Sequence, residues 1–423
     1  MSEKLYILAD ANNFFVSCER VFQPRYCQKP VVVLSNNDGC VVSRSAEAKA
    51  LGIPMGKPYF QLKELLQKKK VKVFSSNFEL YSDFSHRLMS LLQAACPDLE
   101  QYSVDEAFLP STLDRKNAQQ LAQQLHQNLL QQLSLPVSFG IATSKTLAKL
   151  ANHLAKKTPT GVFLWPENPL EAQQLLSNTD VHEIWGIGGQ SARKLYQMGI
   201  QTAWQFQKMN PLLVKSQLGI MGQRIQSELA GQDCLSEIHS SQDQKAILCS
   251  RSFGRSLRDQ QSLRSALASF VEEACQKLQQ QKSCASSFSF FLQQKATAEQ
   301  LSQRQSQFFH LPQASAYPAD FLQLITAELP KLFDASKSYH KAGVCFFDLQ
   351  KAQHFQASLL EIEQTPKNLR HEKLLDSLQR LRRRFGQHSL HFASSQLDHH
   401  WQSRQDRRSP RFSTRLNEIP LAH

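Results

Sequence analysis

Two adjacent carboxylates, Asp105 and Glu106, stand between a stretch that alternates as a β-strand does and a short apolar run. This pattern predicts a tight hairpin with both acids at its tip. Adjacent carboxylates repel each other, so a protein keeps them at low cost when both are solvated or when a cation lies between them. A third carboxylate, Asp10, follows the apolar strand predicted at residues 5–9. Its presence favours a bound cation over simple solvation as the explanation for the paired acids.

Three carboxylates on neighbouring strands supply the hard oxygen ligands that Mg²⁺ prefers. Two such ions at one site activate an attacking hydroxyl and stabilise the leaving oxygen of a phosphoryl transfer. We therefore predict that Asp10, Asp105 and Glu106 are catalytic residues and metal ligands. For Asp10 the alternative is a cap on the helix that follows it. The spacing of the acids does not distinguish a polymerase from a nuclease.

The charge of the chain indicates the substrate. Its 423 residues carry a formal net charge of +13, spread along the sequence rather than gathered in one tail. Such a distribution suits a nucleic-acid duplex lying across several domains. The nine cysteines are scattered without a CxxC pair, which predicts reduced thiols and no zinc site. No apolar run is long enough for a membrane span and no signal peptide is recognisable, so we expect a cytoplasmic protein.

The elements that must position the acids alternate between strands and helices, which predicts an α/β sheet with the acids clustered on one edge. Phe14 and Phe15 follow Asp10, and two consecutive aromatic residues on one turn cannot face the same way. At least one of them should line the cavity that Asp10 faces. Strands are predicted at 31–34 and 137–142, helices at 79–95, 116–133 and 144–154, and a small helical insertion at 35–78.

The character of the sequence changes near residue 170. Gly186 and Gly188 lie in a glycine-rich turn between short helices, a pattern typical of a helix-hairpin-helix element that binds a DNA phosphate. A further α+β unit follows, and its first strand carries Arg251 and Arg255 as candidate DNA contacts. The histidines near the C-terminus lack the spacing of a metal site.

Several motifs recur in a fixed order: residues 10–19, 31–40, 45–52, 74–81, 102–108, 145–153, 184–188 and 249–254. Together they resemble the Y-family translesion DNA polymerases, and within that family the catalytic subunits of bacterial DNA polymerase V. The resemblance covers essentially the whole chain. Two alternatives stay open: a two-metal nuclease, which gives no reason for Phe15 beside Asp10, and a non-catalytic DNA-binding repair subunit, which would be expected to have lost one of the three acids.

The resemblance implies an α+β multidomain fold, a right-hand polymerase with palm, fingers, helical thumb and α+β little finger. The palm would comprise residues 1–34 and 79–170, the fingers 35–78, the thumb with its helix-hairpin-helix 171–242, the little finger 243–355 and a C-terminal tail 356–423.

The implied activity is template-directed synthesis across damaged DNA, with two Mg²⁺ ions, in SOS mutagenesis. Asp10 and Asp105 would contact both ions, Glu106 the catalytic ion, and the Ala11 carbonyl the nucleotide-bound ion. The implied partners are primer–template DNA, deoxynucleoside triphosphates, a sliding clamp, a processed UmuD dimer and a RecA filament.

Phe15 would lie under the sugar as a steric gate, at a position where the family often has Tyr. Many relatives have Arg at the position of Lys49 and Tyr at that of Ala46. The implied triphosphate contacts are the backbone near Asn13 and Phe14 with Lys49 and Lys156, and Lys157 is the alternative to Lys156.

Residues 356–360 resemble the short peptide with which bacterial polymerases bind the sliding clamp. Gln356 would bind the rim of a pocket that Leu359 and Leu360 fill. Looser matches occur at 217–221 and 305–309, but only the 356–360 copy lies at a predicted domain exit. The alternative is that both leucines pack on the third domain.

Overall fold

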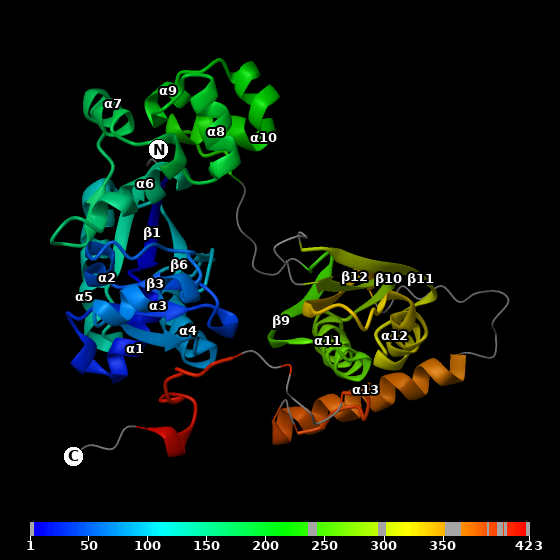
Figure 1. The fold of residues 1–423 in the computed structure, drawn as a ribbon. Helices are drawn as coiled ribbons and strands as arrows, with labels where there is room; N and C mark the ends of the chain where they lie inside the picture. Colours follow the sequence, from blue (N-terminus) through cyan, green and yellow to red (C-terminus); the bar gives the residue numbers. More distant parts are fainter. Residues whose placement is uncertain are drawn as a thin grey trace. The chain divides into compact units, whose positions relative to one another are not determined.

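The computed structural model describes residues 4–235, 243–294, 302–351, 365–386, 389–395, 401 and 404–419 (Figure 1). The chain forms two compact units. The first comprises Met1–Ser35, Gly39–Ser241 and Arg407–His423, and the second Asn36–Asp38 and Gln242–Asp406. The last residues of the chain therefore belong to the same unit as the first ones.

The first unit contains a five-stranded mixed sheet in the order β5-β6-β1-β7-β8. The central strand β1 is antiparallel to both neighbours, and only β7 and β8 run parallel. The acids therefore lie at one end of two central strands, β1 and β6, and not on an edge of the sheet as the sequence predicted. The strands are β1 (Leu5–Ala11), β5 (Glu100–Gln101), β6 (Glu106–Ser111), β7 (Val137–Ala142) and β8 (Val162–Leu164).

The alternation of side chains along β1 divides them between two cores. Leu5, Ile7 and Ala9 pack with helices α1, α4 and α5, whereas Tyr6 and Leu8 pack with α6. By the same alternation, Asp10 lies on the face of β1 that packs against α6. The three helices predicted at residues 79–95, 116–133 and 144–154 are confirmed as α4 (Phe78–Ala95), α5 (Arg115–Leu133) and α6 (Lys145–Ala155). Helix α1 (Phe14–Phe22) precedes them.

The segment expected to be a helical insertion contributes to a sheet of its own. This three-stranded sheet has the order β3-β2-β4. The helices α2 and α3 pack on it through a small apolar core. The elements are η1 (Pro24–Tyr26), β2 (Val31–Leu34), η2 (Asn36–Asp38), β3 (Val41–Arg44), α2 (Ala46–Ala50), α3 (Tyr59–Lys68) and β4 (Lys72–Ser75).

Helices follow the five-stranded sheet and share one apolar core with α6. Gly186 has a φ of +86°, and a Cβ there would lie 2.6 Å from the Ile225 side chain, so the turn requires glycine. The helices are α7 (Pro169–Ser177), η3 (Val181–Glu183), α8 (Gly189–Gln197), α9 (Ala203–Gln207) and α10 (Pro211–Leu229).

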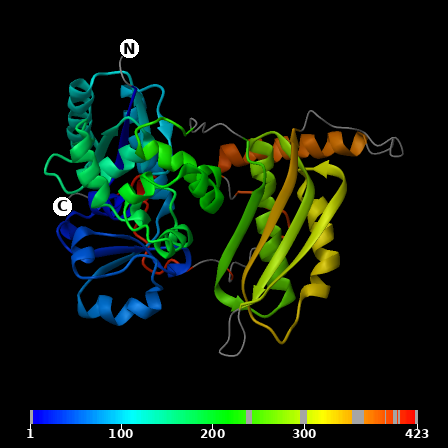
Figure 2. The same cartoon turned by 90° about the horizontal axis from the view of Figure 1, so that it is seen from above.

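The second unit is an antiparallel sheet in the order β11-β10-β12-β9, with α11 and α12 on one face (Figure 2). Helix α13 joins α11 through the buried ion pair of Arg382 and Glu272 at 3.2 Å. The elements are β9 (Ile247–Leu257), α11 (Gln260–Gln280), β10 (Ser283–Gln294), β11 (Arg304–Ser315), α12 (Pro318–Leu332), β12 (Tyr339–Lys351) and α13 (Thr365–Phe385).

The peptide predicted to bind a sliding clamp, with Gln356, Leu359 and Leu360, lies outside the described residues. Beyond that gap, residues 407–419 return to the first unit and end in η5 (Leu416–Glu418). Within the part of the chain that the structure describes, every helix is too short or too polar to cross a membrane.

Gly140 sets the distance between β7 and α6. A Cβ at this position would lie 2.2 Å from both the Ala148 carbonyl oxygen and the Asn152 nitrogen, so backbone atoms would have to move. We expect Gly140→Ala to lower the free energy of unfolding by about 1–3 kcal/mol. Urea unfolding followed by tryptophan fluorescence measures this, since three of the four tryptophans lie in the first unit.

The matched control is Gly189→Ala, because a Cβ at Gly189 meets nothing within 4 Å. Equal unfolding midpoints for the two variants would show that the contact between β7 and α6 is not close.

Candidate active site

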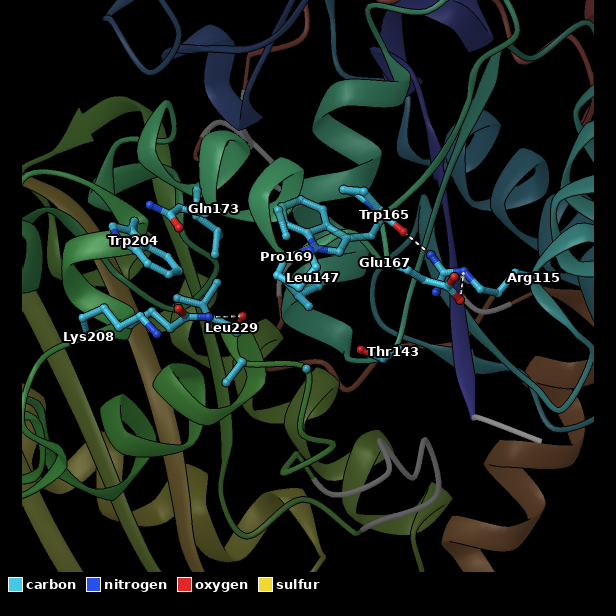
Figure 3. A pocket seen from close by; sticks show the side chains of 16 residues that line it. Arg115, Thr143, Leu147, Trp165, Glu167, Pro169, Gln173, Trp204, Lys208 and Leu229 are labelled. Atoms are coloured by element: carbon cyan, nitrogen blue, oxygen red, sulfur yellow. Dashed lines mark hydrogen bonds and ion pairs between the residues drawn. The ribbon is translucent and has the colours of Figure 1, made fainter. Parts of the chain in front are cut away.

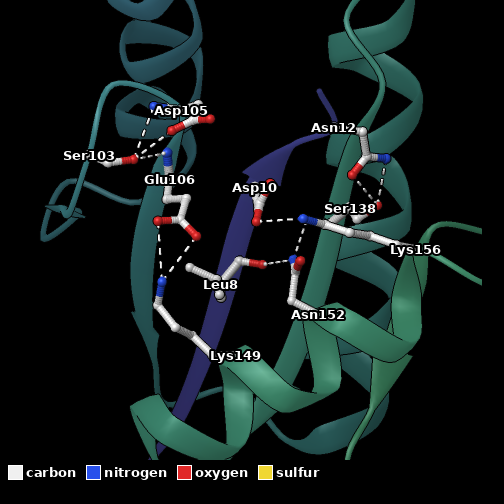
Figure 4. Close-up of polar contacts among 10 residues, drawn as sticks. All are labelled: Leu8, Asp10, Asn12, Ser103, Asp105, Glu106, Ser138, Lys149, Asn152 and Lys156. Atoms are coloured by element: carbon white, nitrogen blue, oxygen red, sulfur yellow. Dashed lines mark hydrogen bonds and ion pairs between the residues drawn. The ribbon is translucent and has the colours of Figure 1, made fainter. Parts of the chain in front are cut away.

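The predicted hairpin is present and carries the acids to one end of the sheet. The Tyr102 and Ser103 amides both donate to the Glu106 carbonyl, at 3.0 and 3.1 Å. Asp10 and Glu106 are register partners across β1 and β6, and the Ala11 amide donates to the Asp105 carbonyl at 3.0 Å. The backbone therefore fixes the three acids on two hydrogen-bonded strands (Figure 4).

Each carboxylate has a partner of its own (Figure 4). Asp10 Oδ2 accepts from Lys156 Nζ at 2.7 Å. Glu106 accepts from Lys149 Nζ at 3.0 and 3.2 Å. Asp105 Oδ1 instead accepts from the Ser103 hydroxyl at 2.7 Å. Two acids thus face cations, and the third is held by its own turn.

Helix α6 and its C-cap provide both lysines. Lys149 and Lys156 are seven residues apart, two turns of helix, and so they lie on one face. The buried Asn152 lies between them, and its amide donates to the Leu8 carbonyl at 3.2 Å and to the Ser138 carbonyl at 2.7 Å. These hydrogen bonds fix the height of α6 above β1 and β7, and with it the position of both ammonium groups.

The acids lie in surroundings that disfavour negative charge. Burial raises the pKa of Asp10 to about 6, and the charges of Glu106 and Asp105 act in the same direction, while Lys156 opposes them. Burial also raises the pKa of Asp105, against its hydrogen bond from Ser103. A cation at this point would relieve both costs.

The donor types fit a hard divalent cation, with three carboxylates and the Ala11 carbonyl at one strand end. The rotamers do not yet converge: among the described residues, no three acidic, histidine or cysteine side chains are arranged to hold one ion. The reason is visible in Figure 4, where Glu106 turns to Lys149 and Asp105 to Ser103. An ion at this site requires these side chains to turn toward Asp10.

The two aromatic residues after the first strand face different ways, as predicted. Phe14 is buried, whereas Phe15 in the first turn of α1 is half-buried. The Phe15 ring stacks on Tyr81 with the centroids 4.5 Å apart and the planes at 14°. The Phe78 ring meets Phe15 edge-on, with the centroids 6.1 Å apart. Phe15 therefore has one face fixed by a buried ring.

The remaining predicted triphosphate residues differ in surroundings. Asn13 has a left-handed backbone, with a φ of 48°, and no side-chain cap at the start of α1. Lys49 on α2 and Lys157 are both exposed. Partial desolvation lowers the pKa of His153, and the charges of Lys157 and Lys49 add to that effect.

The predicted DNA contacts fall in both units. Gly186 and Gly188 precede α8 in the first unit, and Gly188 is the N-cap of that helix. Arg251 and Arg255 lie on β9 in the second unit. Arg251 is paired with Glu273 at 2.9 Å.

The glycine turn touches the carboxylate hairpin through a contact that the sequence did not predict. The Trp185 indole N–H donates to the Tyr102 hydroxyl at 3.0 Å. The Lys149 ammonium lies over both rings, 4.3 Å from the Tyr102 centroid and 5.2 Å from that of Trp185. The turn before α8 is thereby joined to the lysine that holds Glu106.

A separate cavity of about 540 Å³ lies between β7–β8 and the helices that follow (Figure 3). Trp165, Trp204 and Lys208 line it, and Arg115 pairs with Glu167 at 2.9 Å beside it. None of the predicted site residues lines this cavity. The candidate active site is therefore the strand end that carries the acids and not this cavity.

Family models match most of the chain. The impB/mucB/samB family matches residues 9–153 and its C-terminal domain residues 244–359. The chain belongs to the impB/mucB/samB family. A domain of unknown function, DUF4113, matches residues 372–422.

Individual relatives agree with this. Protein UmuC of Salmonella typhimurium is 34% identical over 98% of this chain and 99% of its own length. DNA polymerase IV of Oceanobacillus iheyensis is 30% identical over 53% of each chain. A Y-family DNA polymerase chimera of Dbh and Dpo4 has a TM-score of 0.64 at 23% identity, covering 82% of this chain and 99% of its own. The Y-family polymerase fold predicted from the sequence is thus confirmed.

Two buried polar residues beside the predicted gate were missed. Glu19 is fully buried in α1, and its Oε1 accepts from the Tyr81 hydroxyl at 2.7 Å. The sequence carried one signal. Glu19 and Phe22 follow Phe15 by four and seven residues, so that Glu19 lies within the apolar stripe of the helix. An acid in such a stripe indicates a buried carboxylate with a partner elsewhere.

We propose Lys156 rather than Lys157 as the triphosphate contact. Lys156 reaches Asp10, and Lys157 is its neighbour of equal charge and similar exposure. We expect Lys156→Ala to raise the KM for deoxynucleotides by about 10-fold or more, since an ammonium–phosphate contact is a charge-assisted hydrogen bond. Lys157→Ala is the matched control, and steady-state primer extension measures both. A larger effect of Lys157→Ala would reverse the assignment.

Proposed function

We propose that this chain is a Y-family DNA polymerase that adds deoxynucleotides to a primer opposite damaged template. The observation that carries the proposal is the set of three carboxylates at the adjoining ends of β1 and β6. Two of them are paired with lysines of α6 and its C-cap, Glu106 with Lys149 and Asp10 with Lys156. The family membership and the Y-family fold support it. No observation favours a nuclease, or a DNA-binding subunit that has lost catalysis.

Asp10, Asp105, Glu106 and the Ala11 carbonyl would hold two divalent cations, with Mg²⁺ as the proposed ion. Bound Mg²⁺ supplies activation of the primer hydroxyl and stabilisation of the leaving oxygen. The hydrogen bonds between β1 and β6 hold the backbone of the acids together before any ion arrives, so that binding an ion requires only the side chains to turn. Lys149, whose side chain is only 15% exposed, keeps Glu106 turned toward α6.

The nucleotide would lie across the start of α1. Its triphosphate would accept from backbone N–H groups near Asn13 and Phe14, where the helix has no side-chain cap. Lys156, at the exposed C-cap of α6, can turn from Asp10 to a phosphate oxygen, and Lys49 would add charge. The sugar would rest against Phe15, whose ring would exclude a 2′-hydroxyl by contact.

The remaining partners are proposed from charge and relationship. Primer–template DNA would contact the turn at Gly186 and Gly188 and the arginines Arg251 and Arg255, in keeping with the net charge of +13. The similarity to UmuC supports a processed UmuD dimer as a partner. A RecA filament, a sliding clamp bound by residues 356–360 and a cytoplasmic location complete the proposal.

Loss of one acid should abolish synthesis. We expect Asp105→Ala and Glu106→Ala to lower the rate of primer extension by about 10³-fold or more, because each removes a ligand of the reacting centre. DNA binding, measured by fluorescence anisotropy, should stay near the wild-type value. Glu64→Ala, which removes an exposed acid of α3, is the control. Extension at a near wild-type rate by either site variant would refute the metal assignment.

The gate should act by shape. We expect Phe15→Ala to lower the ratio of kcat/KM for dATP to that for ATP by about 10-fold or more, because the ring no longer meets the 2′-hydroxyl. Phe60→Ala removes an equal ring from α3, 77% exposed, and should leave the ratio unchanged. If the ratio for Phe15→Ala equals that of the wild type, Phe15 is not the gate.

A further inference from the structure

The C-terminal residues 407–419 are built into the first unit (Figure 1). At their start, the Ser75 amide at the end of β4 donates to the Arg407 carbonyl at 3.1 Å. The Arg407 amide donates in turn to the Ser75 hydroxyl at 2.9 Å. The segment falls within the domain of unknown function that matches residues 372–422. Part of that domain thus packs on the polymerase fold itself.

A buried asparagine anchors the segment. The Asn77 side-chain amide donates to the Ser409 carbonyl at 3.2 Å, the Ser409 hydroxyl at 3.0 Å and the Pro410 carbonyl at 3.1 Å. The Phe412 ring stacks on Phe22 of α1, with the centroids 4.9 Å apart. Arg411 pairs with Glu79 of α4 at 2.9 Å. The segment therefore joins α1 to α4.

The Ser409 hydroxyl also reaches the buried acid of α1. It donates to Glu19 Oε1 at 3.0 Å, the same oxygen that accepts from the Tyr81 hydroxyl at 2.7 Å. A carboxylate taken fully out of water is costly unless hydrogen bonds replace its hydration. Burial raises the pKa of Glu19 to about 7, and the hydrogen bonds from Tyr81 and Ser409 oppose that rise. The C-terminal segment thus supplies one of the two hydroxyls on this oxygen.

Tyr81 connects this cluster to the predicted gate. Its ring is 2% exposed and stacks on Phe15, while its hydroxyl is held by Glu19. Phe15 and Glu19 are four residues apart on α1 and so share one helix face. The orientation of the Tyr81 ring, and hence the surface on which Phe15 rests, depends on where Glu19 is held.

We propose that the C-terminal segment 407–412 sets sugar discrimination, with Ser409 as a positioning residue that acts on Phe15 through Glu19 and Tyr81. This inference rests on the proposed role of Phe15 as the gate. The cluster belongs to the core on the α1 and α4 side of β1, whereas Asp10 lies on the α6 side. A change at Ser409 should therefore alter the gate and leave the carboxylates in place.

The test compares dATP and ATP in the full-length chain with Ser409→Ala. We expect the ratio of kcat/KM for dATP to that for ATP to fall by about 2- to 10-fold, the value of one hydrogen bond. The change should appear mainly as a lower KM for ATP, with kcat for dATP unchanged. Ser409→Thr keeps the hydroxyl and should restore the ratio. Leu416→Ala, at an 89% exposed residue that lies beyond the segment 407–412, is the control.

A comparison of Phe15→Ala with Ser409→Ala separates the possible failures. If Phe15→Ala leaves the ratio unchanged, the gate assignment falls and this inference falls with it. If Phe15→Ala changes the ratio but Ser409→Ala does not, the gate stands and the role of the segment is overturned. An equal loss of kcat for dATP and ATP in Ser409→Ala would also overturn the role of the segment, because a general loss of structure lowers the rate with both nucleotides alike.

A double variant tests the proposed route. Tyr81→Phe should also lower the ratio of kcat/KM for dATP to that for ATP. Ser409→Ala should lower this ratio less in the Tyr81→Phe background than in the wild type, because both changes act through Glu19. Fully additive effects would contradict a shared route. Hydrogen exchange in residues 407–412 shows whether the segment stays packed in Ser409→Ala. If the ratio of kcat/KM for dATP to that for ATP is unchanged in Ser409→Ala, the proposal is overturned, whether the segment stays packed or not.

Discussion

The close packing of α6 on the central strands is the constraint on which the site depends. Carboxylates at the ends of β1 and β6 repel one another, and burial raises the pKa of both Asp10 and Asp105. Their charge is offset by two ammonium groups from a single helix. That helix lies at the required height because Gly140 leaves room for its backbone and Asn152 ties it to two strand carbonyls. A bulkier residue in β7 would move both cations at once.

Much of the site could be predicted from the sequence because its determinants are local. The hairpin at Asp105 and Glu106, the strand before Asp10 and the amphipathic helices each follow from a short periodic pattern. The pairing of strands is not local, and so the mixed sheet was expected as an α/β sheet with acids on its edge. The strands of 35–78 were hidden for the same reason: β3 and β4 are only four residues long each, and both are defined by their pairing with β2.

The cluster of Glu19, Tyr81 and Ser409 behind Phe15 could not be predicted as a whole, although the sequence pattern around Glu19 indicated part of it. Glu19 in the apolar stripe of α1 indicates a buried partner, but the pattern does not say which residue supplies it. The partner hydroxyl on Ser409 is 390 residues away, in a polar stretch without periodicity. Contacts of such sequence separation are made by the packed fold, and nothing in the local sequence around Ser409 encodes them. The family model for this region gives no function either.

The return of the chain end to its beginning has a consequence for synthesis on the ribosome. Domains generally fold as they emerge, from the N-terminus onward. Here the core around α1 and α4 lacks Ser409 and Phe412 until the whole second unit has been translated. A nascent or prematurely terminated chain can thus contain Asp10, Asp105 and Glu106 while the side chains that pack behind Phe15 and Tyr81 are still missing. On the proposed role of Ser409, discrimination between sugars would be established only after residues 409–412 have been translated.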